Sequence, residues 1–550
     1  MSKKALIIGN SRYEQALGIK DSSLSNPVND AKDIAEILEY KEFEVTLLKN
    51  MDEDGLKNGL TNFISTVNEG DDILFFFAGH GTEHRDTNYL MPIDCFSNKK
   101  MIDDSSISID EVQMRLNEVN STGTKIIIAD ACRNNQGLEV KGFTKEKSIN
   151  NTIIAFSTSP GNVAYDGQES NGRYTKALIA SMSKYGLGIQ EVFRQTREIL
   201  IKETGFRQIP WEHSSLTKDF TLDSLFIPKL NSMMAISDSP VYSILPFKSS
   251  YFIAKNSAFI SHYSQNIEYT KGSIQTSLED VAEITSNGSV IAFVGGRSYA
   301  AYDITGDKML IEAKVDHTLH TISINNNNVV AIGGESRDIT IHDLKSGTCE
   351  SIDIGKTCAE ALYKNEDQIK HFSNEMSIYA SEFHAQDENI LAVGGAGHSL
   401  VLCDIETKEI LFINDDRDLF NCTYSIAFSQ DGSVFATSHD KGKSILWNTN
   451  TYEQIHVFQT NEHNTKSAFQ ENKSEEMAND VYNVEFSPCG KILAMSTDES
   501  KVLFYDLKYK TLIGEIDLTI EAAPVFDFAY SGDGKNLVVS VKDRIYSFLV

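Results

Sequence analysis

Two short segments carry residues that together can hydrolyse a peptide bond. Ala78-Gly-His-Gly81 contains His80, and Asp130-Ala-Cys-Arg-Asn134 contains Cys132. A thiol peptidase needs this pair, because a thiolate attacks the scissile carbonyl while an imidazole holds the thiolate and protonates the leaving amine. The glycines beside His80 let a substrate backbone approach closely, and the N–H groups of Gly81 and Cys132 are predicted to form an oxyanion hole. We therefore predict a catalytic dyad of His80 and Cys132.

Each residue of the dyad also has an ordinary structural interpretation. A lone cysteine after a strand is usually a small buried hydrophobe, and a lone histidine in a loop is usually structural. The joint pattern favours catalysis, because both residues follow strongly apolar runs and His80 lies 52 residues before Cys132. No C-x-x-C pair is present, so neither a disulfide framework, a metal site nor a cofactor is expected. Six further cysteines lack such a context and are expected to be structural: Cys95, Cys349, Cys358, Cys403, Cys422 and Cys489.

The first half of the chain alternates predicted strands and helices. Apolar runs predict strands at 5–9, 44–48, 73–77, 125–129 and 153–156. Helical periodicity predicts helices at 27–40, 53–67 and 108–119, and two more between 172 and 201. This order predicts an α/β fold with a mainly parallel sheet flanked by helices. In such folds the chemistry lies in loops after the carboxyl ends of strands, which is where His80 and Cys132 are found.

Residues 3–222 resemble the caspase-like cysteine peptidases, and metacaspases and paracaspases more than animal caspases. The resemblance implies the caspase–haemoglobinase fold and endopeptidase activity without a metal in the catalytic step. The matching stretches, in chain order, are Ala5-Leu-Ile-Ile-Gly-Asn-Ser-Arg-Tyr13, Asn26-Pro-Val-Asn-Asp30, Phe76-Phe-Ala-Gly-His-Gly81, Tyr89-Leu-Met-Pro-Ile-Asp94, Asp130-Ala-Cys-Arg133 and Ala155-Phe-Ser-Thr-Ser-Pro-Gly161.

An acid replaces a residue that matters for specificity. Animal caspases carry glutamine two residues before the nucleophile, whereas this chain carries Asp130, as do the relatives that cut after Arg or Lys. By the same resemblance, Asp30 and Asp166 match the acidic pocket of paracaspases. Carboxylates arranged around a guanidinium bind it through forked hydrogen bonds and repel an aspartate. The expected substrate is therefore a protein or peptide with a basic P1 residue; the alternative is that Asp30 faces solvent on its helix.

Two further segments leave alternatives open. The polar stretch 133–152 follows the predicted nucleophile and contains three lysines. In caspase relatives the matching linker is an activation loop that is cut, but it can equally be an uncut mobile loop. Asp103 and Asp104 resemble an acidic pair that metacaspases use near the pocket or for calcium, and they are left out of the predicted site.

The second half of the chain is a repeat. A unit of about 40 residues recurs beyond residue 238, and it resembles the WD40 repeat of β-propellers. Units begin near 240, 280, 318, 377, 422, 480 and 523, which predicts seven blades, with insertions near 356–376 and 460–480. The last unit is one strand short, so we expect 225–237 to close the ring. The predicted domains are a caspase-like domain at 1–224 and an all-β propeller at 225–550.

Charge and composition restrict the partners. The formal net charge is −28, of which residues 225–550 carry −20. Such a surface repels phosphate backbones, so nucleic acid is not expected, while basic proteins or peptides are favoured. No apolar run approaches the length of a membrane span, and no secretory leader is evident. We therefore expect a cytoplasmic protein that does not associate with a membrane.

We thus expect a cysteine endopeptidase cleaving after Arg or Lys, regulated by an activating protein or ligand at the propeller. Resemblance to bacterial-type caspase-like proteins with repeat sensor domains implies a role in controlled cell death or anti-phage defence. Two alternatives stay open. One is a non-catalytic WD40 scaffold with a relic caspase fold, against which the intact His80 and Cys132 speak. The other is a calcium-gated, metacaspase-like enzyme.

Overall fold

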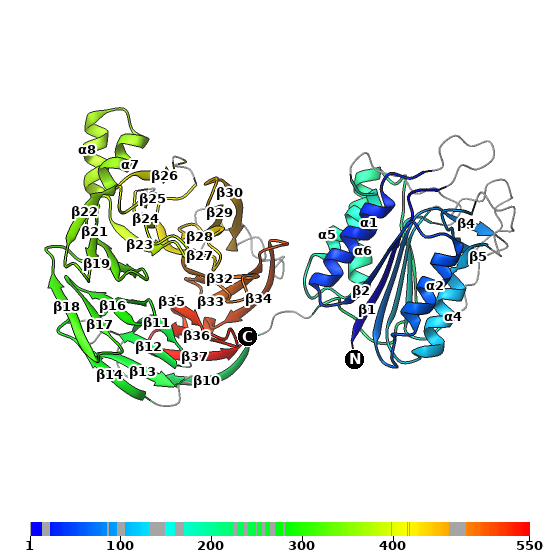
Figure 1. Ribbon diagram of the computed structural model, residues 1–550, viewed down its shortest axis with the longest axis horizontal. Helices are drawn as coiled ribbons and strands as arrows, with labels where there is room; N and C mark the ends of the chain where they lie inside the picture. The colour runs from blue at the N-terminus through cyan, green and yellow to red at the C-terminus, as the bar shows by residue number, and fades with distance from the viewer. Residues whose placement is uncertain are drawn as a thin grey trace. The chain divides into compact units, whose positions relative to one another are not determined.

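The computed structural model divides the chain into two compact units, Met1–Leu225 and Phe226–Val550 (Figure 1). Each unit is described by itself. The residues that the structure describes are 2–13, 23–84, 87–95, 105–131, 149–159, 170–223, 228–235, 240–248, 250–255, 259–264, 270–278, 281–397, 399–414, 416, 419–460 and 480–550.

The first unit is built on a six-stranded sheet in the order β2-β1-β3-β7-β8-β9. Its strands are β1 (Lys3–Gly9), β2 (Glu44–Lys49), β3 (Asp72–Ala78), β7 (Lys125–Asp130), β8 (Thr152–Phe156) and β9 (Trp211–Ser214). The first five pair in parallel, and β9 is antiparallel to β8. The central strands are buried apolar runs, as expected of a parallel sheet covered on both faces.

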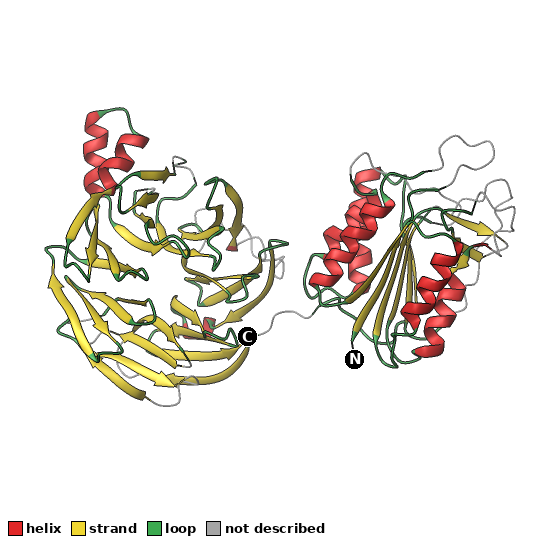
Figure 2. Ribbon diagram, viewed as in Figure 1, coloured by secondary structure: helices red, strands yellow, loops and turns green. Residues whose placement is uncertain are grey.

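Helices cover both faces of this sheet (Figure 2). One face carries α1 (Pro27–Tyr40), α5 (Arg173–Met182) and α6 (Ile189–Thr204), and the other carries α2 (Glu53–Ile64) and α4 (Ile109–Val119). A small antiparallel sheet of β4 (Gly81–His84), β5 (Thr87–Leu90) and β6 (Ile107–Ser108) follows β3. The core beneath α2 and α4 contains Phe75, Phe77 and Ile127.

Local signals in the sequence set the helix ends. The side chain of Asp52 accepts from the Gly55 N–H at the start of α2, and Ser108 does the same for Glu111 in α4. The helix α1 begins with Pro27, whose fixed φ suits a first turn. Gly205 ends α6 in the left-handed conformation, with φ of 58°.

The second unit consists of seven four-stranded antiparallel sheets, which form a seven-bladed propeller (Figure 1). The first four blades are β11 (Val241–Phe247), β12 (Ser250–Lys255), β13 (Phe259–Ser264) and β14 (Thr270–Gln275); β15 (Glu283–Ser286), β16 (Val290–Gly295), β17 (Ser298–Asp303) and β18 (Lys308–Lys314); β19 (Leu319–Ile324), β20 (Val329–Gly334), β21 (Asp338–Asp343) and β22 (Cys349–Asp353); and β23 (Ile378–Phe383), β24 (Ile390–Gly395), β25 (Leu400–Asp404) and β26 (Ile410–Ile413). The last three are β27 (Thr423–Phe428), β28 (Val434–His439), β29 (Lys443–Asn448) and β30 (Gln454–Gln459); β31 (Val481–Phe486), β32 (Ile492–Thr497), β33 (Lys501–Asp506) and β34 (Thr511–Asp517); and β35 (Val525–Tyr530), β36 (Asn536–Val541), β37 (Arg544–Leu549) and β10 (Lys229–Ala235).

The expected fold class, a mainly parallel α/β unit followed by a seven-bladed propeller, is confirmed. The predicted insertion at 356–376 is a pair of helices, α7 (Ile354–Leu362) and α8 (Glu366–Glu375). The predicted insertion at 460–480 lies mostly outside the described residues. A short 3-10 helix, η3 (Thr519–Glu521), follows β34.

The last blade takes its outer strand from the start of the unit. The strand β10 lies within the segment 225–237 and pairs antiparallel with β37 from Lys229 opposite Leu549 to Ala235 opposite Arg544. Met234 on β10 also packs against the apolar cluster that contains Val538 and Ile545. The ring is thus closed by residues from both ends of the propeller, which leaves β37 without an open edge.

Replacing Lys229–Ala235 with seven Gly and Ser residues is expected to destabilise the propeller. The variant loses one strand ladder and the burial of Met234, so the free energy of unfolding should fall by at least about 2 kcal/mol. The chain has two tryptophans, so urea unfolding in a Trp211→Phe background follows Trp447, which lies in the propeller strand β29. An unchanged urea midpoint would show that β10 does not stabilise the ring.

Candidate active site

Two neighbouring strands bring the predicted dyad segments to one edge of the sheet. The strands β3 and β7 pair in parallel with Ala78 opposite Asp130, and the Gly79 N–H donates to the Asp130 carbonyl at 3.2 Å. His80 stands two residues after Ala78, and Cys132 stands two residues after Asp130 in the sequence. Cys132 itself lies outside the described residues. The register therefore places His80 beside the strand that leads directly into Cys132.

Tyr13 holds the backbone of His80. The phenol oxygen of Tyr13 accepts the His80 N–H at 2.7 Å and donates to the Met91 carbonyl at 3.2 Å. The Met91 N–H donates in turn to the His80 carbonyl at 3.1 Å. The Tyr13 and His80 rings are tilted by 57° with centroids 4.4 Å apart. Burial raises the pKa of Tyr13, so the phenol keeps the proton that it donates.

The close approach of Tyr13 explains why glycine precedes His80. A β-carbon on Gly79 would stand 2.4 Å from the Tyr13 phenol oxygen and 3.0 Å from the Phe77 ring. Neither contact is tolerable, because both rings are buried. Any larger residue at 79 would displace the tyrosine that holds His80.

A buried asparagine ties three segments together beneath the site. Asn10 directly follows β1 and is fully buried. Its backbone N–H donates to the Ala78 carbonyl at 2.9 Å, and its side-chain amide donates to the carbonyls of Met91 at 3.2 Å and Met51 at 3.3 Å. The Met51 N–H donates back to the Asn10 side chain at 2.8 Å. This network fixes the end of β3 against the Met91 segment that also supports Tyr13.

Gly81 presents its N–H away from its hairpin partner. The hairpin pairs Gly81 with Leu90, and the hydrogen bond beside them runs from the Met91 N–H to the His80 carbonyl. This pattern makes Gly81 and Leu90 a non-hydrogen-bonded pair, in which neither N–H points at the other strand. Because β4 is the edge of its sheet, the Gly81 N–H faces the open side of the hairpin.

Asp30 is buried, so the alternative in which it faces solvent is wrong. The side chain lies in the first turn of α1, where the helix dipole favours a negative charge. Asp30 is 3 % exposed, and its carboxylate accepts a hydrogen bond from the Gly172 N–H at 2.9 Å. Gly172 immediately precedes α5, so this hydrogen bond joins the starts of two helices.

Asp130 and Asp30 approach the same point. Asp130 ends β7, and its carboxylate accepts the Thr175 hydroxyl at 2.7 Å. A β-carbon built on Gly172 would lie 3.2 Å from a carboxylate oxygen of Asp30 and 3.5 Å from one of Asp130. Glycine at 172 therefore leaves room between two carboxylates, and a cationic group there would contact both.

The remaining site predictions fall outside the described residues. These are Asp166 and most of the 133–152 segment. Asp103 and Asp104, which are not part of the predicted site, also lie outside the described residues. Sequence analysis did not assign roles to the supporting residues Tyr13, Asn10, Gly172 and Thr175. Asn10 and Tyr13 lie in the matching stretch Ala5–Tyr13, and Asn10 is also a polar residue directly after a buried strand, whereas Gly172 and Thr175 carry no comparable signal.

No group of three or more His, Cys, Asp or Glu side chains in the described ranges is arranged to hold a metal ion. No helix in the part of the chain that the structure describes is long and apolar enough to cross a membrane.

Comparison with known proteins identifies the first unit. The family profile of the caspase domain matches residues 2–221. The human mucosa-associated lymphoid tissue lymphoma translocation protein 1 and its mouse homologue are each 24% identical to this chain over 181 residues. The matched segment covers 32% of this chain and 21% of each relative, so the chain spans about a fifth of the length of these curated relatives. Residues 2–221 thus form a caspase domain.

Tyr13→Phe is expected to destabilise the caspase domain by about 1–3 kcal/mol. The substitution removes the acceptor for the His80 N–H and the donor to the Met91 carbonyl in a buried setting. Urea unfolding in a Trp447→Phe background measures this, because Trp211 of β9 then reports on the domain alone.

Tyr174→Phe is the matched control. Tyr174 is equally buried, but its hydroxyl has no hydrogen-bond partner among the described residues. Its removal should leave stability unchanged or raise it. Equal effects of the two substitutions would contradict a specific role for Tyr13.

Proposed function

We propose that the chain is a cysteine endopeptidase that cleaves proteins after arginine or lysine. Cys132 is the nucleophile and His80 is its general base and acid. The observation that carries the proposal is the pairing of Ala78 with Asp130, because it sets the segments of both residues side by side at the carboxyl edge of the sheet. The caspase domain match over residues 2–221 supports the same chemistry.

The reaction follows from the roles of these groups. His80 takes the Cys132 proton, and the thiolate attacks the scissile carbonyl carbon to give a tetrahedral intermediate. The N–H groups of Gly81 and Cys132 stabilise its oxyanion, a role supported by the outward orientation of the Gly81 N–H. The imidazolium then protonates the leaving amine, and water hydrolyses the acyl-enzyme. Tyr13 keeps His80 in position by fixing its backbone.

The P1 pocket is proposed to contain Asp30, Asp130 and Asp166. The two carboxylates that converge beside Gly172 support this assignment. A guanidinium binds two carboxylates as a planar fork, whereas an ammonium is a point charge, so arginine should be preferred to lysine. An aspartate at P1 would be repelled.

The propeller is proposed to regulate or target the peptidase. Seven-bladed propellers commonly serve as interaction platforms, and an activating protein or ligand bound there would link a signal to cleavage. A cytoplasmic location is part of the proposal, on the scattered cysteines and the absence of an apolar run long enough for a membrane span. By resemblance to bacterial-type caspase-like proteins with repeat sensor domains, the proposed role is controlled cell death or anti-phage defence.

Cys132→Ala and His80→Ala should each abolish cleavage of a fluorogenic P1-Arg peptide while the domain stays folded. The controls are Cys349→Ala and His213→Ala, since both residues are exposed and distant in sequence from the dyad. Both controls should retain parental turnover. Cleavage by the Cys132→Ala or His80→Ala protein at the parental rate would sink the dyad, and a parent inactive with every P1 residue, with and without calcium or lysate, would favour the scaffold alternative.

Asp130→Asn should lower kcat/KM for a P1-Arg peptide at least about tenfold. A charge-assisted hydrogen bond contributes roughly 1.5–3 kcal/mol, and about 1.4 kcal/mol is tenfold in rate. The loss should be smaller for a neutral P1 residue, which does not use the carboxylate. Asp54→Asn on the exposed start of α2 is the control. A preference for P1-Asp, or full P1-Arg activity in Asp130→Asn, would overturn the acidic pocket and leave the dyad untouched.

A further inference from the structure

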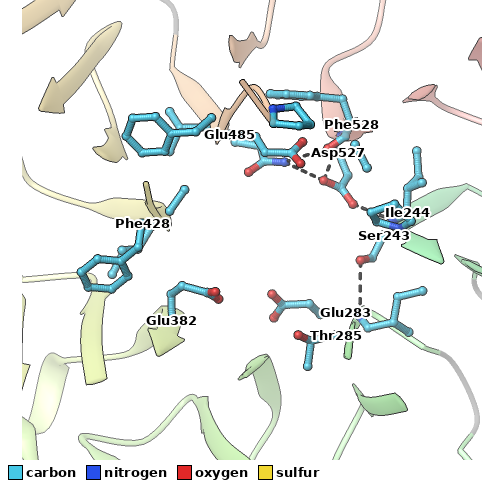
Figure 3. A pocket seen from close by; sticks show the side chains of 18 of the residues that line it. Ser243, Ile244, Glu283, Thr285, Glu382, Phe428, Glu485, Asp527 and Phe528 are labelled. Atoms are coloured by element: carbon cyan, nitrogen blue, oxygen red, sulfur yellow. Dashed lines mark hydrogen bonds between the residues drawn. The ribbon is translucent and has the colours of Figure 1, made fainter. Parts of the chain in front are cut away.

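The centre of the propeller holds an acidic cavity of about 560 Å³. Four inner strands contribute one carboxyl group each: β15, β23, β31 and β35 supply Glu283, Glu382, Glu485 and Asp527 (Figure 3). No lysine, arginine or histidine is among the described residues that line it. The cavity therefore concentrates acidic groups without a basic side chain of its own to neutralise them.

Three of the four acids hold neighbouring blades together. The Asp527 carboxylate accepts the Ile244 N–H at 2.6 Å and the Asn483 side-chain amide at 2.6 Å. The Glu283 carboxylate accepts the Ile322 N–H at 3.0 Å, and that of Glu485 accepts the Tyr530 N–H at 3.3 Å. In each case a backbone donor belongs to an adjacent blade, so a structural role accounts for these residues.

Glu382 has no such hydrogen bond to an adjacent blade. Its carboxylate makes no hydrogen bond or ion pair with any described residue, and it points into the cavity toward Glu283 (Figure 3). The partial exposure that it keeps is to this cavity. A carboxyl group that lines a cavity without a donor from the chain is available to a donor or a cation that enters the cavity.

Burial raises the pKa of all four acids. The pKa rises to about 8 for Glu283 and Glu382 and to about 7 for Asp527, and that of Glu485 rises well above its usual value. Mutual repulsion adds to burial for Glu283, which faces Glu382 and Asp527, and for Glu485, which faces Asp527. A cation entering the cavity would favour the ionised forms.

Aromatic side chains form a collar at the strand starts that lead into the cavity. Six of the seven inner strands carry an aromatic ring as their second residue, and neighbouring ring centroids are 5.3 to 6.4 Å apart. The collar consists of Tyr242, His320, Tyr379, Tyr424, Tyr482 and Phe526. In each of these strands the pairing register shifts at that residue, and such bulges re-aim a side chain.

The collar is a partly exposed aromatic surface that precedes Glu382 and Glu485 along their strands. Tyr242 and Phe526 are 36% and 40% exposed. Glu382 and Glu485 lie three residues further along their strands, or about 10 Å deeper at the usual rise per residue. Exposed aromatic residues around a pocket are typical of protein interfaces, and aromatic faces attract cations.

We propose that the propeller binds a lysine or arginine side chain of a partner polypeptide, with the charged group among the cavity acids and the flanking residues on the aromatic collar. The net charge of −20 over 225–550 would steer a basic partner toward this unit. A metal ion fits less well, because these acids do not converge as a metal-binding group among the described residues. The proposal does not depend on the peptidase assignment.

Glu382→Gln tests this in the full chain carrying Cys132→Ala, which prevents cleavage of the probe. The measurement is fluorescence anisotropy with labelled nona-arginine and nona-lysine at 150 mM NaCl. Glu382→Gln should weaken binding of at least one probe at least tenfold. The matched control is Glu409→Gln, an identical change at an exposed residue of the same blade, which should alter binding less than twofold. Equal affinities of the two variants would overturn the proposal.

Two further measurements test the role of the collar and distinguish a polypeptide from a free cation. Tyr379→Leu should weaken peptide binding, and unchanged binding would overturn the role of the collar. Spermine is a free cation of the same charge type. Binding of spermine that depends on Glu382, with no binding of either peptide, would overturn the assignment to a polypeptide.

Binding should also strengthen between pH 6 and pH 9 as Glu283, Glu382 and Asp527 ionise. Without a bound cation, the stability of the propeller should instead fall as the pH rises. Glu283, Glu382 and Asp527 each have a folded pKa above the unfolded value, so the stabilising contribution of each is lost as pH rises through the folded pKa of about 7 to 8. Glu382→Gln should therefore be at least as stable as the parent at pH 9, as measured by urea unfolding followed through Trp447 in the Trp211→Phe background. A loss of binding in Glu382→Gln then reflects the missing carboxylate rather than unfolding. Affinity that falls between pH 6 and pH 9 would contradict the acidic site.

Discussion

The parallel pairing of β3 with β7 is the constraint on which the rest of the caspase domain depends. Both strands lie in the middle of the sheet and are buried on both faces, so a slip of one residue would exchange every side chain between two packed layers. That register puts Ala78 opposite Asp130. Asn10 and Tyr13 then fix the chain beyond β3, and Asp30 and Gly172 lie beside Asp130 at the end of β7. The proposed dyad and the proposed P1 pocket are therefore two consequences of one strand pairing.

The elements that the sequence predicted are those that bury a continuous or repeated apolar pattern. The central strands of the caspase domain and the inner strands of all seven blades belong to this class, because burial dictates their residue types. The strand β9 was not predicted, since Trp211–Ser214 is a largely exposed edge strand that depends on its pairing with β8. The hairpin of β4 and β5 was missed for a related reason: each strand has four residues, too few for a periodic signal.

The two candidate sites differ in how far the sequence could reveal them. Polar residues directly after buried strands pointed to His80 and Asp130, and a family motif pointed to Asp30. Tyr13 contributes through a contact with the distant His80, which no local pattern encodes. The cavity acids could not be predicted from the sequence, because no local pattern sets them apart. Glu382 and Asp527 stand in ordinary-looking strands of different blades, and only closure of the ring brings such residues around one cavity. The excess of acid in the second half was evident, but its location was not.

The most direct test of the account is the pH dependence of Cys132 alkylation. Iodoacetamide reacts with the thiolate, and tryptic digestion isolates Cys132 in the peptide Ile126–Arg133, where it is the single cysteine. If the β3–β7 register pairs Cys132 with His80, the parent should react rapidly well below the ordinary thiol pKa of about 8.5, and His80→Ala should shift the profile to that ordinary value. An ordinary profile in the parent, identical to that of His80→Ala, would contradict the pairing.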